Sequence, residues 1–311
     1  MSFQFFQSPT LFRYPTVFKE FPHARYPSLR CFQLTEVAQM LDSQEQEIYQ
    51  SHEKEIVDRL TRFTMMMKSK TIPFQTLYPL KWDLGLPDNF DKILIPKYPE
   101  HFEVVMSPLG LPCLRLRMFK SGHAVLKFPM KFPKGYGGMN KVKNWMEQFH
   151  KLPYISPYED AIGIDPKSDL MEKRVVGVLH EVLSLTIHKK TWRNYLRRLR
   201  EELILPEKFT RLFTRYPGIF YLSLKCKTTT IALREGYEKG RLVNPHPLAR
   251  LRWKICHVMK TGLLYRDKGL AKVNDSDYQS QLENEYDHVE GSSEDEEELE
   301  VDDVHRSEEH T

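Results

Sequence analysis

Apolar residues recur at helical spacing in the first part of the chain. From Asp42 to Lys68 the apolar positions that fall on one helix face are Ile48, Ile56, Leu60, Phe63 and Met67. Asp42 and Ser43 are suitable N-cap residues, and Glu45 and Gln46 follow them in the first turn. The pattern therefore predicts one long helix over 42–68.

Shorter elements follow this helix. A second helix is predicted over 74–84, and a third begins at Pro87, a residue suited to the first helical position. Tyr98 ends the third helix, because a residue before proline avoids the α region. Two apolar stretches, 102–105 and 113–116, then predict a hairpin. The order is three helices and a two-stranded hairpin.

The same order recurs in the second half of the chain. There the predicted helices cover 171–185, 191–203 and 206–215, and the predicted hairpin covers 219–224 and 229–233. An earlier, incomplete copy contains the end of a helix at 8–14 and a hairpin formed by 17–21 and 30–34, so we expect the chain to begin inside a repeat. Three helices followed by a hairpin is the order of a winged helix. The predicted fold class is α+β, predominantly helical, with degenerate winged-helix-like repeats.

A short motif marks each copy: a basic residue, Tyr-Pro, two variable residues and Phe. It occurs at 13–18, 97–102 and 215–220. Repeated units of this kind usually bind rather than catalyse. The aromatic residues of the motif suit either stacking on bases or packing of the hairpin onto the helices, and their position between a helix and a strand favours packing.

Charge is distributed unevenly along the chain. Residues 275–311 contain 16 of the 42 acidic residues and one basic residue, Arg306, which leaves 45 basic and 26 acidic residues in 1–274 and a net charge of +19 there. A polyanion, most often nucleic acid, is the expected partner of so basic a body. The acidic tail has no core-forming pattern and is expected to be disordered. It serves solubility or competes with RNA for the basic faces.

These features predict four parts. Residues 1–118 hold the truncated first repeat and the second helix/hairpin repeat, and 161–274 hold the third repeat. Between them, 119–160 form a basic linker in which lysines alternate with aromatic residues and glycines. Residues 275–311 form the acidic tail.

The candidate catalytic and metal-binding motifs are incomplete. Gly135-Tyr136-Gly137-Gly138 lacks the Gly-Lys-Ser/Thr ending of a phosphate loop. His180 begins a zinc-protease pattern, but Ser184 stands where the second histidine is required, so His180 is expected on the surface. The four cysteines form no CxxC pair. We therefore predict no enzyme activity, no metal, no cofactor and no small-molecule substrate, and the negative mean hydropathy argues against a membrane span.

The predicted helix over 191–203 separates an apolar face from a basic one. The apolar face consists of Trp192, Tyr195, Leu196, Leu199 and Leu203. The basic face and the outward side of the next helix supply the candidate RNA-binding residues Lys190, Arg193, Arg197, Arg200, Lys208, Arg211 and Arg215. Arginine binds phosphate oxygens with its planar fork and stacks on unpaired bases. The alternative is a solvated face in which Arg197 pairs with Glu201 and Arg198 with Glu202.

The corresponding helix of the earlier unit carries less charge. We expect Phe90, Ile93 and Leu94 to point inward, and Asn89, Lys92 and Lys97 to point outward. The later unit is therefore the stronger candidate for binding.

Four segments have distinctive sequences: LYPLKWDLGLP at 77–87, YISPY at 154–158, VGVLHEVLSL at 176–185 and RYPGIFY at 215–221. With them the chain resembles the plant organelle RNA recognition (PORR) domain family over about 8–269. The resemblance implies a nuclear-encoded plant protein that binds organelle RNA and promotes splicing of group II introns. It implies mitochondria as the preferred location and chloroplasts as the alternative. Family members normally carry a further upstream stretch and a transit peptide, which we expect this chain to lack.

The expected partner is organellar intron RNA, together with other splicing factors, and the intron itself supplies the catalysis. No membrane partner is expected. Two alternatives remain open: a winged-helix protein that binds organellar DNA, and a protein adaptor in a splicing complex. Preference for B-DNA over RNA would favour the first, because the two helices present different grooves.

Overall fold

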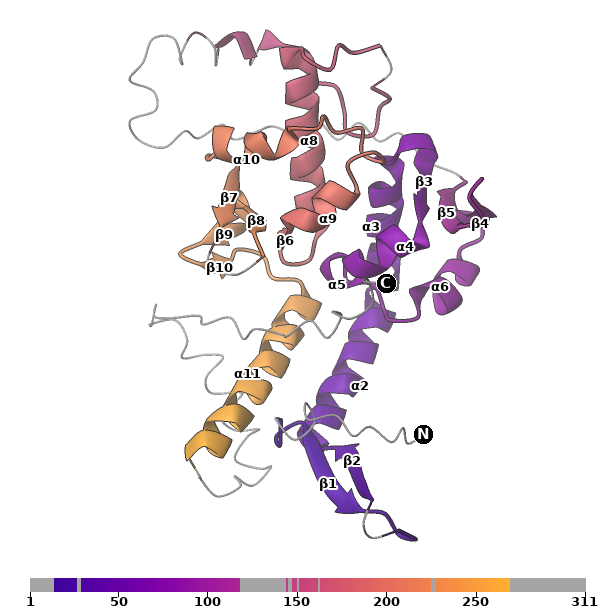
Figure 1. Cartoon of the computed structure of the whole chain (residues 1–311), viewed down its shortest axis with the longest axis vertical. Helices are drawn as coiled ribbons and strands as arrows, with labels where there is room; N and C mark the ends of the chain where they lie inside the picture. The colour runs from indigo at the N-terminus through magenta and orange to yellow at the C-terminus, as the bar shows by residue number, and fades with distance from the viewer. Residues whose placement is uncertain are drawn as a thin grey trace, which may run out of the picture.

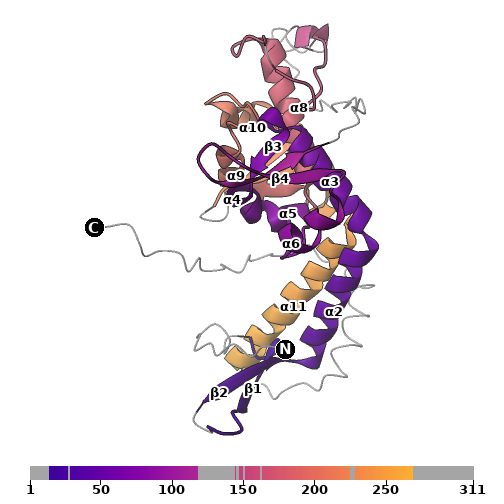
Figure 2. The ribbon, with the colours of Figure 1, turned by 90° about the vertical axis from the view of Figure 1, so that its right-hand side faces the viewer.

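The computed structural model describes residues 14–26, 29–117, 144, 147–149, 151–161, 163–224 and 228–268. For residues 263–268 it describes the backbone alone. These residues form a body and an arm that projects from it (Figure 1), and Figure 2 shows the same arrangement turned by 90°. Helices and small antiparallel sheets make up both parts, so the predicted α+β class is confirmed. The acidic tail predicted at 275–311 and most of the linker predicted at 119–160 lie outside the described residues.

The first unit of the body begins with a long helix and ends with a hairpin. Its elements are α3 (Glu53–Met65), η1 (Lys68–Lys70), β3 (Thr71–Pro73), α4 (Phe74–Leu77), η2 (Tyr78–Leu80), α5 (Lys81–Leu84), α6 (Phe90–Ile93), η3 (Ile95–Lys97), β4 (Phe102–Met106) and β5 (Pro112–Leu116), where η denotes a 3-10 turn. The strands form an antiparallel sheet in the order β3-β5-β4. The central strand, β5, lies against α3.

The second unit repeats this order of elements. Its elements are α8 (Asp169–Leu185), β6 (Lys190–Trp192), α9 (Arg193–Arg198), η5 (Phe209–Arg211), α10 (Leu212–Arg215), β7 (Phe220–Ser223), β8 (Thr230–Leu233), η6 (Arg234–Gly236), β9 (Tyr237–Glu238) and β10 (Arg241–Leu242). The sheet order β6-β8-β7 corresponds strand for strand to β3-β5-β4. The repeated sequence thus folds into two copies of one topology.

Both predicted hairpins of the body are confirmed, and each is joined by a third strand that the sequence did not predict. The strands β3 and β6 have only three residues each, too few for alternation of polar and apolar residues to show. Pairing with the hairpin defines them instead. Ile72 lies opposite Leu114, Thr191 lies opposite Ile231, and all four side chains are buried.

The arm consists of two helices and a hairpin. Its elements are β1 (Phe18–Pro22), β2 (Arg30–Leu34), α2 (Glu36–Ser51) and α11 (Pro247–Lys268). The helices α2 and α11 lie side by side, and the predicted first hairpin, confirmed as β1–β2, lies at their far end (Figures 1 and 2). The arm has a small core of its own, formed by Val37, Leu41, Leu251 and Val258. The helix α11 had no counterpart in the sequence prediction.

The single helix predicted from Asp42 onward was wrong. The arm helix α2 begins earlier, where the Thr35 hydroxyl caps it by accepting a hydrogen bond from the Ala38 N–H at 3.2 Å. The chain then turns at His52, whose φ of −107° and ψ of 17° separate α2 from α3. Apolar positions before Asp42, such as Val37, belong to the core of the arm, so the helical pattern starts earlier than the cap residues suggested.

One continuous buried core extends through both units. The helix α8 carries buried residues on nearly all sides, including Glu181, which is 2% exposed. The Glu181 carboxylate accepts a hydrogen bond from Arg62 of α3 at 2.6 Å and another from the Tyr158 hydroxyl. The expectation of a surface histidine at His180 was wrong, because that side chain is 3% exposed and lies 2.6 Å from the Glu235 carboxylate. Because protein surrounds α8 on nearly all sides, the helix has no polar face from which the exposure of a histidine could be predicted.

The recurring motif attaches each hairpin to the long helix of its unit. In the first unit Lys97 and the Tyr98 hydroxyl both donate to the carboxylate of Glu53, the first residue of α3, at 2.7 and 2.9 Å. In every copy the Phe N–H of the motif donates to the carbonyl oxygen of its Tyr at 3.0 Å. In the first unit the motif therefore forms a turn that its own side chains anchor to α3.

The second unit contains the same attachment in a more buried form. Arg215 and the Tyr216 hydroxyl donate to the Glu172 carboxylate on α8 at 2.8 and 2.5 Å. Tyr216 and Phe220 are 2% and 1% exposed. The prediction that the aromatic residues of the motif pack rather than stack on bases is confirmed for these two side chains.

The end of α5 connects the first unit to both of the other parts. The Trp82 carbonyl accepts a hydrogen bond from Arg252 of α11 at 2.6 Å, and the Arg252 guanidinium also lies 3.5 Å from the centre of the Trp82 ring. The Asp83 carbonyl accepts from the Ile187 N–H of the second unit at 2.9 Å. The Asp83 carboxylate accepts from the Thr191 hydroxyl of β6.

The residue after α5 has to be small. Gly85 has a φ of +65°, and a Cβ built there would lie 2.9 Å from both Arg59 Nη1 and Ile187 Cγ2. Arg59 is held nearby because its Nη1 donates to the Leu84 carbonyl at 2.8 Å. Glycine at this position therefore allows α3, α5 and the second unit to approach one another closely.

We expect the motif tyrosines to contribute unequally to stability. Tyr216→Phe should lower the free energy of unfolding by about 1.5 to 3 kcal/mol, because it removes a buried hydrogen bond to a charged acceptor. Tyr98→Phe is the matched control in the half-buried copy and should cost less. Urea denaturation followed by circular dichroism measures both values. Equal losses would show that burial does not strengthen the attachment.

A second prediction concerns pH. Burial raises the pKa of the Asp83 carboxyl from 3.8 to about 6, while the Thr191 hydroxyl and the Arg252 charge oppose the rise. Because the folded protein holds this proton more tightly than the unfolded chain, the contribution of Asp83 to stability is fully present below pH 3.8 and is lost as the pH rises through about 6. Asp83→Asn should therefore increase the free energy of unfolding above that pH by about 1 to 3 kcal/mol.

The test compares urea denaturation of Asp83→Asn and wild type in acid and at neutral pH. The difference between the two proteins should be large at neutral pH and should shrink in acid. Other groups that titrate in this range, such as His188, are present in both proteins and cancel in the difference. A constant difference would show that Asp83 acts only through its hydrogen bond.

Candidate nucleic-acid interface

The basic residues of the second unit lie on β6, on α9 and on the turns that follow. The helix predicted over 191–203 was wrong at both ends, because Thr191 and Trp192 belong to β6 and α9 ends at Arg198. Thr191 is held in the sheet by pairing with Ile231 and by its hydrogen bond to Asp83. Tertiary contacts thus select the strand.

The leucines of the predicted apolar face are confirmed as core residues. Leu196, Leu199 and Leu203 are fully buried. Trp192 does not belong to this face, since it lies on β6 and is 44% exposed. The three leucines hold α9 and the following turns against the core, which fixes the direction in which the arginines project.

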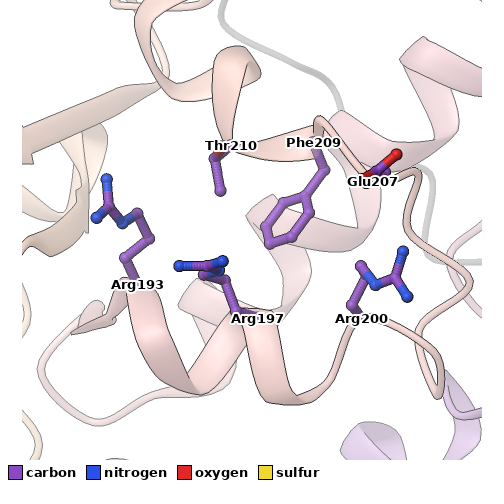
Figure 3. A pocket seen from close by; sticks show the side chains of 6 residues that line it. All are labelled: Arg193, Arg197, Arg200, Glu207, Phe209 and Thr210. Atoms are coloured by element: carbon purple, nitrogen blue, oxygen red, sulfur yellow. The ribbon is translucent and has the colours of Figure 1, made fainter.

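Three of the candidate arginines line one open pocket. Arg193, Arg197 and Arg200 project from α9 and the turn after it, and Figure 3 shows Thr210, Phe209 and Glu207 across the pocket from them. The pocket has a volume of about 480 Å³. The long basic side chains and the chain segment at η5 therefore form opposite walls of one depression.

The alternative, in which glutamates along the same helix neutralise the arginines by ion pairs, does not apply to the arginines of the pocket. Glu201 pairs with Arg200, at 3.1 Å, and this carboxylate is 83% exposed on its side chain. Within the part of the chain that the structure describes, neither Arg193 nor Arg197 forms an ion pair, and the Arg193 Nε has no hydrogen-bond partner although it is buried. The guanidinium groups retain donors for an anion.

The other four candidates lie around this pocket in different states. Lys208 and Arg211 are exposed, at and just before η5. Lys190 is half-buried on β6. Arg215 is bound to Glu172 by the motif attachment described above. The structure thus brings three of the seven together, leaves Lys190, Lys208 and Arg211 outside the pocket lining, and gives Arg215 a structural contact of its own.

The corresponding surface of the first unit differs, as expected. Lys97 is bound to Glu53, and Lys92 is exposed. Phe90 and Leu94 are buried as predicted, but Ile93 is 54% exposed, because α6 is a single turn that ends at this residue and buries only Phe90. The expectation for Ile93 was wrong.

The chemical capacity of the pocket follows from its donors. An arginine presents five N–H groups in a planar fork that matches the oxygens of a phosphate. Among the described residues there is no group of three or more histidine, cysteine, aspartate or glutamate side chains placed to hold a metal ion. The helices that the structure describes include none long and apolar enough to cross a membrane. The three arginines suit an anion such as a phosphate group.

The sequence missed the far wall of this pocket. Glu207, Phe209 and Thr210 lie after a loop that no periodic pattern covers, and Phe209 was expected only as a core residue. The helix predicted over 206–215 was wrong at its start, because the helical turns begin only at Phe209, with η5 and α10.

The chain matches the sequence profile of the plant organelle RNA recognition domain twice, over residues 2–126 and 115–264. The two matches together cover most of its length. The chain therefore belongs to the plant organelle RNA recognition (PORR) family.

Relatives in this family come from both plant organelles. The chain is 34% identical over 288 residues to Protein WHAT'S THIS FACTOR 9, mitochondrial, of Arabidopsis thaliana, across 83% of this chain and 74% of the relative. It is 31% identical over 269 residues to Protein WHAT'S THIS FACTOR 1 homolog, chloroplastic, of the same plant, and 32% identical to Protein WHAT'S THIS FACTOR 1, chloroplastic, of Zea mays. These two matches cover 78% of this chain but only 50% and 53% of the relatives. No solved structure matches the chain.

Proposed function

We propose that this protein binds organellar RNA and promotes splicing of group II introns by binding and organising intron RNA, which itself supplies the catalysis. The observation that carries the proposal is the pocket on which Arg193, Arg197 and Arg200 converge, with only Arg200 ion-paired among these three in the part of the chain that the structure describes. A chain that belongs to an RNA recognition family and lines an open pocket with three arginines has a direct means of holding phosphates.

We assign the phosphate contacts to the pocket arginines, with Lys190, Lys208 and Arg211 on its margin. Arg215 belongs to the same basic surface but shares its charge with Glu172, so we expect its contribution to be smaller. The proposed division of labour follows from contacts: a guanidinium already bound to a carboxylate gains less from a phosphate than one with open donors.

We further propose that the two units of the body are winged-helix-like modules, each following the order helix, strand, helices and hairpin. Under this proposal α9 and α10 stand where a helix-turn-helix would present its basic residues. The domain boundaries proposed from the sequence, 1–118, 119–160, 161–274 and 275–311, place this presentation within the third repeat.

Mitochondria are the proposed location, supported by the mitochondrial relative at 34% identity, and chloroplasts are the alternative. Other splicing factors are proposed as additional partners. A non-enzymatic role fits this assignment, because the proposed protein contributes binding energy to RNA rather than chemistry.

The salt dependence of binding tests the phosphate clamp. Binding of a fluorescein-labelled poly(U) oligonucleotide by the full chain should weaken with salt, with a log-log slope of about 0.7 per contacted phosphate. Arg193→Ala, Arg197→Ala and Arg200→Ala combined should reduce this slope by roughly 2. The matched control, Lys92→Ala, Arg115→Ala and Arg117→Ala, also removes three charges but should preserve the slope. Equal effects of both triples would contradict the assignment of the pocket.

Co-precipitation tests the splicing role. The tagged protein should enrich a few intron-containing transcripts from plant organelle extract, and a variant with Arg193, Arg197 and Arg200 changed to Glu should lose them. Enrichment that survives the change would move the site elsewhere. Capture of splicing proteins that persists after nuclease treatment would favour the adaptor instead, and preference for duplex DNA in competition would favour the DNA-binding alternative.

Glu207, the acidic residue that lines the pocket, leads to a prediction of tighter rather than weaker RNA binding. Glu207→Gln should tighten binding of the same poly(U) oligonucleotide by about 2- to 5-fold at low salt, because it removes one like-charge repulsion of surface strength. Glu47→Gln, an equal change of charge on the exposed side of α2, should have no effect. Unchanged affinity for Glu207→Gln would show that phosphate does not enter the pocket.

A further inference from the structure

The outer face of the second sheet carries two exposed aromatic rings. Trp192 on β6 and Tyr221 on β7 are 44% and 48% exposed. Their neighbours in sequence, Thr191 and Phe220, are buried on the opposite face, which follows from the alternation of side chains along a strand. The two rings therefore lie on the side of the sheet that faces away from the core.

Between these rings the central strand presents only small side chains. Trp192 pairs with Thr230 of β8, which pairs with Ser223 of β7, and Tyr221 pairs with Ala232. Neighbouring strands are about 4.8 Å apart, so β6 and β7 are separated by roughly 10 Å. The sheet thus offers a shallow floor with an aromatic ring at each of two diagonal corners.

One of the rings is already held in place. Trp192 stacks on Tyr195, three residues further along in α9, with ring centres 5.2 Å apart and an angle of 28° between the planes. A side chain restrained in this way loses less rotamer freedom when a ligand packs on it. The exposed part of the indole is therefore preorganised for a flat partner.

The aromatic face and the arginine pocket are joined through adjacent residues of the chain. Trp192 precedes Arg193 in the chain, at the junction of β6 and α9, so an aromatic ring and a phosphate-binding guanidinium project from adjacent residues. Lys190 shares the outer face with Trp192, two residues away on the same strand. Aromatic rings beside a basic groove are the arrangement by which proteins hold unpaired nucleic acid.

The first unit provides an internal comparison, because its sheet has the same topology without these rings. The residues at the corresponding outward positions are Pro73 on β3 and Glu103 on β4. Glu103 pairs there with Arg115 at 3.5 Å. The exposed aromatic pair is thus a property of the second unit and not of the shared fold.

We infer that Trp192 and Tyr221 form a stacking platform for unpaired RNA bases, so that the arginine pocket takes single-stranded rather than duplex RNA. The inference rests on the proposed function and adds to it the class of RNA and the residues that contact bases. A base stacked on Trp192 places its own or the next phosphate towards Arg193 and the pocket. Duplex RNA cannot use the platform, because its bases are stacked on one another.

Binding of poly(U) and of the same strand annealed to poly(A) tests this inference on the full chain. The single strand should bind more tightly, and Trp192→Ala and Tyr221→Ala should each weaken its binding by about 5- to 100-fold. The salt slope should stay at the wild-type value, because no phosphate contact is lost. Tyr26→Ala is the control, since Tyr26 is 60% exposed at the β1–β2 hairpin on the arm.

A spectroscopic signature separates stacking from a structural effect. Trp192→Phe should retain most of the affinity but lose the part of the tryptophan fluorescence quenching that poly(U) causes through Trp192. Thermal unfolding should be close to wild type for every variant, because both rings are exposed.

The outcomes separate this inference from the proposed function. If Trp192→Ala and Tyr221→Ala bind poly(U) like wild type while the arginine triple loses it, the platform is refuted and the proposed function stands. If wild type prefers the duplex, the inference is likewise overturned. If wild type binds neither RNA, the proposed function falls with it.

Discussion

The three carbonyl groups at the end of α5 hold the described parts of the molecule together. A short helix leaves its last carbonyls without partners inside the helix. Here each is occupied by a different element: Arg252 from the arm binds Trp82, the Ile187 N–H from the second unit binds Asp83, and Arg59 from α3 binds the carbonyl that follows. One helical turn therefore contacts both the arm and the second unit, in addition to the core that the two units share and the turn at His52 that joins α2 to α3.

This dependence explains why the segment around α5 is so constrained. The two arginines that reach it are mostly buried, and burial lowers the pKa of each guanidinium without removing its charge at physiological pH. Their positive charge is balanced locally by the carbonyl dipoles, by the Trp82 ring and, for Arg59, by the Glu55 carboxylate at 2.5 Å. Gly85 is required because a side chain would enter the space that these groups fill.

Sequence patterns predicted the helix α8 and the hairpins well, and the short elements and the arm helices badly. The helix α8 and the hairpins of the body were predictable because they contribute regularly spaced apolar residues to one continuous core. The strands β3 and β6 were not, because three residues carry no period and only the hairpin beside them defines their conformation. The helix α11 was missed because its apolar residues pack against α2, which lies far away in sequence.

The candidate site shows the same limit. The spacing of arginines along 193–200 was sufficient to place three of them on one surface. The spacing did not reveal that Trp192 faces solvent, since this depends on which residue starts the helix, nor that Arg215 is committed to Glu172. The sequence allowed two roles for a basic residue inside the recurring motif: binding RNA, or fastening the hairpin to the long helix. Only the observed contact between Arg215 and Glu172 distinguishes the two roles.

The attachment by Glu53 in one unit and Glu172 in the other has a consequence for how the two copies differ. Because the same pair of side chains fastens the hairpin in both copies, the framework of each unit is maintained independently of its outer surface. One copy is then free to provide the joint through α5, while the other exposes aromatic and basic side chains. The two copies thus share one scaffold and differ in the side chains that they present on its outer face.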